Sequence, residues 1–142
     1  MKTEEITAIT VETTLAAPVA QVWSLWTEAR HIKKWYYASD DWYAPDAVND
    51  LQVTGTFSTT MAAKDGSMAF EFEGVYTRIV PLKAIDYTLN DGRKVSVIFT
   101  SKGNETTVTE VFEPETSHPL DLQKNGWQAI LDNFRKYVET QS

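Results

Sequence analysis

The chain has 142 residues, a formal net charge of −7 and no cysteine. This length fits one domain spanning 1–142, large enough to bury a hydrophobic core without crosslinks. The lack of cysteine excludes disulfides, thiolate metal sites and a cysteine nucleophile, and the acidic charge disfavours a nucleic-acid partner because a phosphate backbone would be repelled.

The first residues, 1–5, are polar and lack the apolar stretch of a secretion signal. No apolar run approaches the roughly 20 residues that cross a bilayer. The sequence therefore predicts no membrane insertion and a cytoplasmic location. Residues 6–15 alternate between apolar and polar side chains, with Ile9, Val11 and Leu15 on one face, and this alternation predicts a half-buried strand.

Two short helices are predicted next. The first starts at Pro18, because proline needs no amide partner at the first helical position. The second is expected over 28–36, and the aromatic and acidic stretch 36–50 fits no period and is predicted to be a long loop with at most one short strand. The apolar faces of the two helices are Val19, Val22, Trp23 and Trp26, and Ile32, Trp35 and Tyr36.

From residue 51 onward, apolar and polar residues alternate in five runs separated by turn signals such as Asp65-Gly66 and Gly103-Asn104. Strands joined by such short turns are antiparallel neighbours, so this region is predicted to be a meander. The residues that define the strands are Leu51, Val53, Phe57 and Met61; Met68, Phe70 and Phe72; Ile85, Tyr87 and Leu89; Val95, Val97 and Phe99; and Val108 and Phe112.

A long amphipathic helix is predicted over 118–140. Gly126 lies inside it, where glycine costs about 1 kcal/mol relative to alanine. We expect this glycine to allow a close approach to the helix backbone, by a strand or loop or else by a bound ligand. The apolar stripe of the helix is Trp127, Ile130, Leu131, Phe134 and Val138.

Several stretches resemble a known family. Residues 9–35 resemble the opening of the START-like (SRPBCC) superfamily. Three further stretches resemble the Hsp90-ATPase-activator-like (AHSA1-type) branch of this superfamily. They are Asp50-Leu51 with Gly55 and Phe57, Gly74-Val75-Tyr76, and Gly126-Trp127 with residues 130–134. The resemblance implies an α+β helix-grip fold, in which a curved seven-stranded antiparallel sheet wraps around the long C-terminal helix, with two short helices after the first strand and a cavity between sheet and helix.

The implied cavity makes the aromatic and apolar side chains candidates for ligand contact, since pockets for small molecules are mostly apolar and aromatic. The same side chains would serve as plain core, and the sequence does not separate the two roles. The stretch 36–50 is expected to cap one end of the cavity. The candidate ligand-binding residues are Trp35, Tyr37, Trp42, Phe57, Met61, Phe70, Phe72, Tyr87, Phe99, Trp127 and Leu131.

Glu110 is a weak catalytic candidate, because it lies between Val108 and Phe112 on the strand face predicted to point inward. A carboxyl group facing an apolar cavity has a raised pKa and can act as an acid or base. The alternative is a shifted register that places it in solvent. His31 and His118 have no second ligand at helical spacing, so no metal is expected, and no cofactor motif is present.

Three functions are open. The first is a non-catalytic carrier or sensor that binds a small apolar molecule, lipid-like or polyketide-like. The second is an enzyme of the polyketide cyclase, dehydratase or hydrolase kind, using Glu110 with a tyrosine such as Tyr87. The third is a protein-interaction module like the chaperone activator. An apolar cavity lining favours the first, convergent polar groups the second, and a large exposed apolar patch the third.

Overall fold

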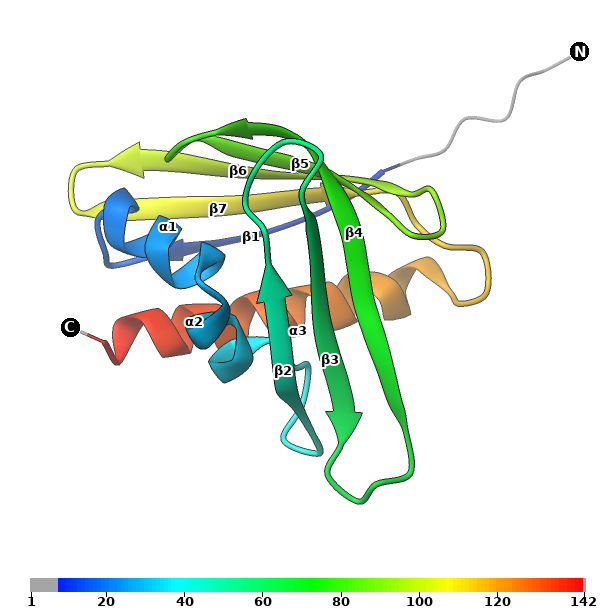
Figure 1. Cartoon of the computed structure of the whole chain (residues 1–142). Helices are drawn as coiled ribbons and strands as arrows, with labels where there is room; N and C mark the ends of the chain where they lie inside the picture. Colours follow the sequence, from blue (N-terminus) through cyan, green and yellow to red (C-terminus); the bar gives the residue numbers. More distant parts are fainter. Residues whose placement is uncertain (1–7, 142) are drawn as a thin grey trace, which may run out of the picture.

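The computed structural model describes residues 8–141. Its elements follow the predicted order of one strand, two short helices, a run of strands and a long last helix (Figure 1). The start of the strand expected at 6–15 lies outside the described residues. The elements are β1 (Ile9–Leu15), α1 (Val19–Thr27), α2 (Ala29–Trp35), β2 (Trp42–Asn49), β3 (Thr56–Ala63), β4 (Ala69–Val80), β5 (Ala84–Leu89), β6 (Lys94–Lys102), β7 (Glu105–Phe112) and α3 (Leu120–Glu139).

The strands form one antiparallel sheet in the order β1-β7-β6-β5-β4-β3-β2. Figure 1 shows the sheet curling, with β2–β4 at a steep angle to β5–β7 and with α3 on the concave side. The short helices α1 and α2 each contact both the sheet and α3. This is the predicted α+β helix-grip arrangement.

The sheet bends where β4 meets β5. The register shifts there between Tyr76 and Arg78, and a bulge of this kind bends a strand and increases its twist. The first half of β4 therefore turns away from β5 and runs with β3 as a long hairpin whose tip extends past α3 (Figure 1). At this tip Gly66 has a φ of +79°, as the Asp65-Gly66 turn signal predicted.

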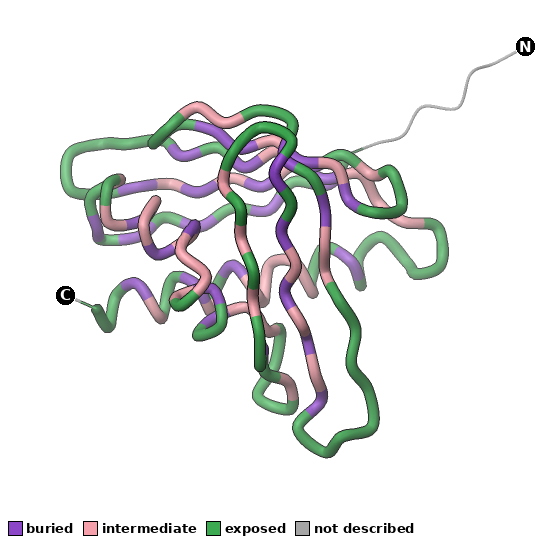
Figure 2. The backbone as a smooth tube through the Cα atoms, in the orientation of Figure 1, coloured by how far each residue is buried: buried purple, intermediate pink, exposed green. Residues whose placement is uncertain are grey.

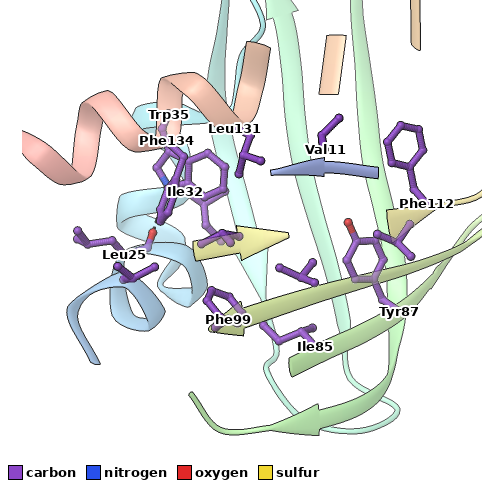
Figure 3. Close-up of a cluster of buried hydrophobic side chains, with 14 of the residues drawn as sticks. Val11, Leu25, Ile32, Trp35, Ile85, Tyr87, Phe99, Phe112, Leu131 and Phe134 are labelled. Atoms are coloured by element: carbon purple, nitrogen blue, oxygen red, sulfur yellow. Dashed lines mark hydrogen bonds between the residues drawn. The ribbon is translucent and has the colours of Figure 1, made fainter. Parts of the chain in front are cut away.

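The hydrophobic core fills the space between the concave face of the sheet and α3 (Figure 3). Val97 on β6, Val108 on β7, and Leu131 and Phe134 on α3 are all completely buried. Trp35 packs against Phe134 with ring centroids 4.6 Å apart. The alternation of buried and exposed residues along the strands in Figure 2 confirms the predicted faces of β1, β5, β6 and β7.

The prediction of a long loop over 36–50 was wrong. Most of that stretch is the edge strand β2, which pairs with β3. Pro45 obscured this strand, because proline lacks an amide hydrogen and is found in sheets mainly at edges and bulges. Here β2 is an edge strand, and its register with β3 shifts between Tyr43 and Asp46, so Pro45 lies both at an edge and at a bulge.

The strand expected from residue 51 starts later than predicted. Residues 51–55 form a turn in which Thr54 has a φ of 70°, and β3 begins at Thr56. A Cβ atom at Gly55 would lie 2.2 Å from the carbonyl oxygen of Asp50. Leu51 and Val53 thus belong to a tight turn rather than to a strand.

The last helix agrees closely with the predicted span of 118–140. It begins at Leu120 after Pro119, and Asp121 in its first turn interacts favourably with the helix dipole. Within residues 8–141, neither α3 nor a shorter helix is long and apolar enough to cross a membrane.

Candidate functional site

A pocket of about 410 Å³ lies between α3, the β3–β4 hairpin and the segment that follows α2. Its apolar walls come from elements far apart in the sequence, which the curl of the sheet around α3 brings together. One side carries polar groups: Arg93, Glu110, Glu115, His118 and Gln123. The apolar walls include Trp26, Trp35, Met61, Phe72, Trp127 and Ile130.

Aromatic contacts fix the walls of this pocket. Trp127 on α3 stacks on Phe112 with ring centroids 3.8 Å apart and meets Phe72 of β4 edge-on at 5.9 Å. Tyr36 lies between Trp35 and Phe72, with centroid separations of 5.0 and 5.5 Å. Each ring is held by at least one other ring, so the walls are ordered without a ligand.

Backbone anchors hold the end of α2 against α3. The indole Nε1 of Trp35 donates to the carbonyl oxygen of Leu25 at 3.1 Å. The side-chain amide of Asn133 on α3 donates to the carbonyl oxygen of Trp35 at 2.8 Å. These bonds set the position from which Tyr36 enters the pocket.

Glu110 contributes a carboxyl group to the pocket from the middle of β7. Its side chain is 3% exposed, and its strand partners are Val11 and Val97. The carboxyl forms no hydrogen bond with any residue in 8–141, and burial raises its pKa to about 8. Glu110 is therefore mostly protonated at pH 7 and can donate as well as accept a hydrogen bond.

The polar rim near the start of α3 is occupied by internal bonds. The amide nitrogen of Gln123 donates to the carbonyl oxygens of Glu115 at 3.0 Å and His118 at 2.9 Å. Its amide oxygen accepts from the Glu115 backbone N–H at 2.9 Å, and His118 Nδ1 lies 2.9 Å from Glu115 Oε1. These groups hold the 115–118 segment against α3 and form a fixed rim.

Comparison with known proteins identifies the family. The sequence profile of the family described as Activator of Hsp90 ATPase homolog 1-like protein matches residues 16–139. The chain belongs to this AHSA1-like family. Curated proteins give no significant match to this AHSA1-like domain.

Solved structures agree with this assignment. The AHSA1-like protein from Aeromonas hydrophila is 41% identical, with 95% of this chain and 94% of that chain covered and a TM-score of 0.89. A protein from Cytophaga hutchinsonii is 51% identical, with 94% and 93% covered and a TM-score of 0.81. A protein from Nitrosomonas europaea, at 19% identity, 98% coverage of both chains and a TM-score of 0.81, shares the fold. Family and fold support a ligand-binding or activator-type domain.

The sequence-predicted site residues of the AHSA1-like domain are spread over several places, and five of them line the main pocket. A smaller neighbouring pocket of about 40 Å³ contains Phe57 and Tyr87, and Tyr37 lies at a shallow polar hollow beside α3. Phe99 and Leu131 are core residues, and Trp42 packs edge-on against Phe70 with centroids 5.7 Å apart. The predicted residues that line the main pocket are Trp35, Met61, Phe70, Phe72 and Trp127.

The expectation that a strand or loop packs closely against Gly126 was wrong. A Cβ atom built there meets no atom within 4 Å, so no strand or loop approaches the helix backbone. Gly126 instead lines the pocket. A side chain at this position would extend into the pocket volume. The alternative that remains is that the glycine leaves room for a bound ligand close to the helix backbone.

Several lining residues were absent from the predicted set, among them Trp26, Tyr36, Arg93 and Ile130. Trp26 and Tyr36 belong to the helix faces recognised in the sequence and could have been included, because those faces point toward the sheet. Arg93 follows a turn, and no sequence signal marks it.

The two histidines have structural partners. His31 Nδ1 lies 2.7 Å from the hydroxyl of Tyr137, which links α2 to α3, and His118 belongs to the rim. Residues 8–141 contain no group of three or more His, Asp or Glu side chains placed to hold a metal.

Proposed function

We propose that this AHSA1-like domain binds one small, mostly apolar molecule in the main pocket, as a carrier or sensor. The observation that carries the proposal is the pocket volume of about 410 Å³ beside a well-packed core. Pockets for small ligands typically measure about 300–1,000 Å³ and are lined mostly by apolar and aromatic side chains.

The lining supports an apolar ligand with one polar end. Trp35, Phe72 and Trp127 offer aromatic surface on several sides, while Glu110 offers a hydrogen-bonding group at one place. The ligand contacts we propose are the predicted residues that line the pocket together with Trp26, Tyr36 and Ile130. The ligand is lipid-like or polyketide-like in the sense that its body is apolar and fits between aromatic rings.

Gly126 allows a clean test, because it lines the pocket and a Cβ atom added there meets no atom within 4 Å. Gly126→Leu should lower the affinity for a neutral apolar dye such as Nile red at least tenfold while the melting temperature does not fall. Lys124→Leu is the matched control, because it adds the same side chain to the same helix at an exposed position outside the pocket.

Native mass spectrometry of freshly purified protein, with identification of any molecule released on denaturation, addresses the natural ligand. Equal dye affinity in the wild type and both variants would place dye binding elsewhere and contradict the proposal.

An enzymatic role is the second candidate, favoured by the buried Glu110 whose pKa is raised to about 8. A group with this pKa exchanges a proton near neutral pH and suits general acid–base catalysis. Conversion of a polyketide-like substrate that depends on Glu110, with Glu110→Gln inactive but still able to bind, would favour this role over a carrier.

An activator role is the weaker alternative, and it follows from the family description alone. Met68 and Phe70 at the end of the β3–β4 hairpin are exposed apolar side chains that a protein partner would cover. Stimulation of an Hsp90 ATPase that is abolished by Met68→Ser, with dye binding unchanged, would support it.

A further inference from the structure

Three polar groups from separate elements line the main pocket and the smaller pocket beside it. Glu110 is on β7, Tyr87 is on β5, and Tyr36 follows α2. Tyr36 lines both the main and the smaller pocket, Glu110 lines the main one and Tyr87 the smaller one. Figure 3 shows the Tyr87 side chain projecting from the sheet into the interior.

Strand pairing places Tyr87 and Glu110 on the same face of the sheet. Tyr87 pairs with Val95 of β6, and Glu110 pairs with Val97 of the same strand. Side chains two residues apart on a strand share a face, so Tyr87 and Glu110 both project from the concave surface, with β6 between their two strands. Burial raises the pKa of Tyr36 and of Tyr87, and the charge of the nearby Glu110 carboxylate raises both further.

None of the three groups has a hydrogen-bond partner among residues 8–141. Every side-chain polar atom in this part of the chain that is sealed from solvent does have a partner. The carboxyl of Glu110 and the hydroxyls of Tyr36 and Tyr87 therefore touch open space, and the two pockets supply that space. A ligand that fills this space displaces water from these groups, and leaving a polar group dry and unpaired is costly, so the groups favour a ligand that replaces those hydrogen bonds.

Resting on the proposed binding function, we propose that Glu110 and Tyr36, the two of these groups that line the main pocket, receive one uncharged hydrogen-bond acceptor, a carbonyl oxygen, on the otherwise apolar ligand. Both groups are donors when neutral, and a carbonyl oxygen has two lone pairs to accept from them. A purely apolar ligand would leave both unpaired in a drier environment.

A ligand carboxylate fits less well. Arg93 is the cationic residue that lines the pocket, and its Nε already donates to Asp91 at 2.7 Å. A buried anion without its own cation is far costlier than a neutral acceptor. The site therefore selects a ketone, ester or amide over an acid with the same apolar body.

The preference depends on pH. Below about pH 8 Glu110 is neutral and donates; above it, the ionised carboxylate cannot donate and repels the carbonyl oxygen. The other titratable groups that line the two pockets are Tyr36, Tyr76, Tyr87, Arg93, Glu115 and His118. The three tyrosines keep their protons through this range, because burial raises their pKa values.

The test compares two probes of nearly the same shape, 2-acetylnaphthalene and 2-isopropenylnaphthalene, by titration of tryptophan fluorescence. The ketone should bind the wild type about tenfold more tightly than the alkene at pH 6.5, a ratio consistent with one to two satisfied hydrogen bonds. The ratio should shrink above pH 8. Glu110→Leu should reduce it to the contribution of Tyr36, while Glu110→Gln, which keeps a donor, should retain it at every pH.

The outcomes separate this inference from the binding function. Equal binding of both probes to the wild type overturns the carbonyl site and leaves the apolar pocket standing. Failure of both probes to bind overturns both proposals. Tighter binding of 2-naphthoate than of the ketone at pH 6.5 also overturns the inference, because it would show that the site prefers an anion. The wild-type comparison does not require any variant to fold.

Discussion

Replacing Glu110 with glutamine should stabilise the protein, and increasingly so as the pH rises. The carboxyl has a pKa of about 8 in the folded chain, against an ordinary value of 4.5 that the unfolded chain should show. Between these values the folded state holds a proton that the unfolded state releases, so Glu110 lowers the free energy of unfolding by about 1.4 kcal/mol per pH unit. Its stabilising contribution is complete below pH 4.5 and lost as the pH passes 8.

The gain at pH 7 is roughly 3 kcal/mol in favour of Glu110→Gln. The glutamine amide is neutral at every pH, nearly the same size as the carboxyl, and faces the same pocket space. The two proteins should therefore have similar stability at pH 4.5 and diverge steadily up to pH 8.

Urea denaturation at pH values from 4.5 to 9 measures this divergence. Glu105→Gln is the matched control, because Glu105 lies on the same strand at an exposed position. Subtracting the wild-type curve removes the contributions of all other titrating groups. Parallel curves for the wild type and Glu110→Gln would mean that Glu110 is hydrated and ionised in the folded state, and would refute the reasoning.

The remaining predictions concern two glycines and one tryptophan. Gly126→Ala should raise the free energy of unfolding by up to about 1 kcal/mol, since the helix gains a better former and the new methyl group meets nothing; a lower melting temperature would contradict this. Gly74→Ala should destabilise by about 2 kcal/mol, because its Cβ would lie 2.6 Å from the carbonyl oxygen of Thr88; unchanged stability in urea would show that the sheet yields there. Trp42→Ala should weaken dye binding only slightly, because Trp42 does not line the pocket itself but packs against Phe70, which does; a loss as large as that of Gly126→Leu would place Trp42 in the pocket.

Much of the fold could be predicted from periodicity. The alternation in β5, β6 and β7 is regular because one face of each strand meets the core and the other meets solvent, and the same regularity correctly placed Glu110 inward. The apolar stripe from Trp127 to Val138 predicted the helix α3 with equal regularity. These patterns are strong because burial on one side leaves few acceptable residue types.

The errors occur where burial is weak or where the contacts are distant in sequence. The edge strand β2 packs little of its length inward, so its pattern is irregular and Pro45 is tolerated. The packing role expected for Gly126 was wrong because the sequence does not distinguish a glycine packed against another segment from a glycine that lines an open pocket. Arg93 lines the pocket together with residues that are distant in sequence, and no pattern around residue 93 indicates that contact.

An NMR titration of isotope-labelled protein with 2-acetylnaphthalene tests the central claim most directly. The account predicts saturable shifts that cluster at Tyr36, Phe72, Glu110, Gly126 and Trp127, and that disappear in Gly126→Leu. Shifts confined to the exposed end of the β3–β4 hairpin, or no shifts at a saturating concentration of the ketone, would contradict it.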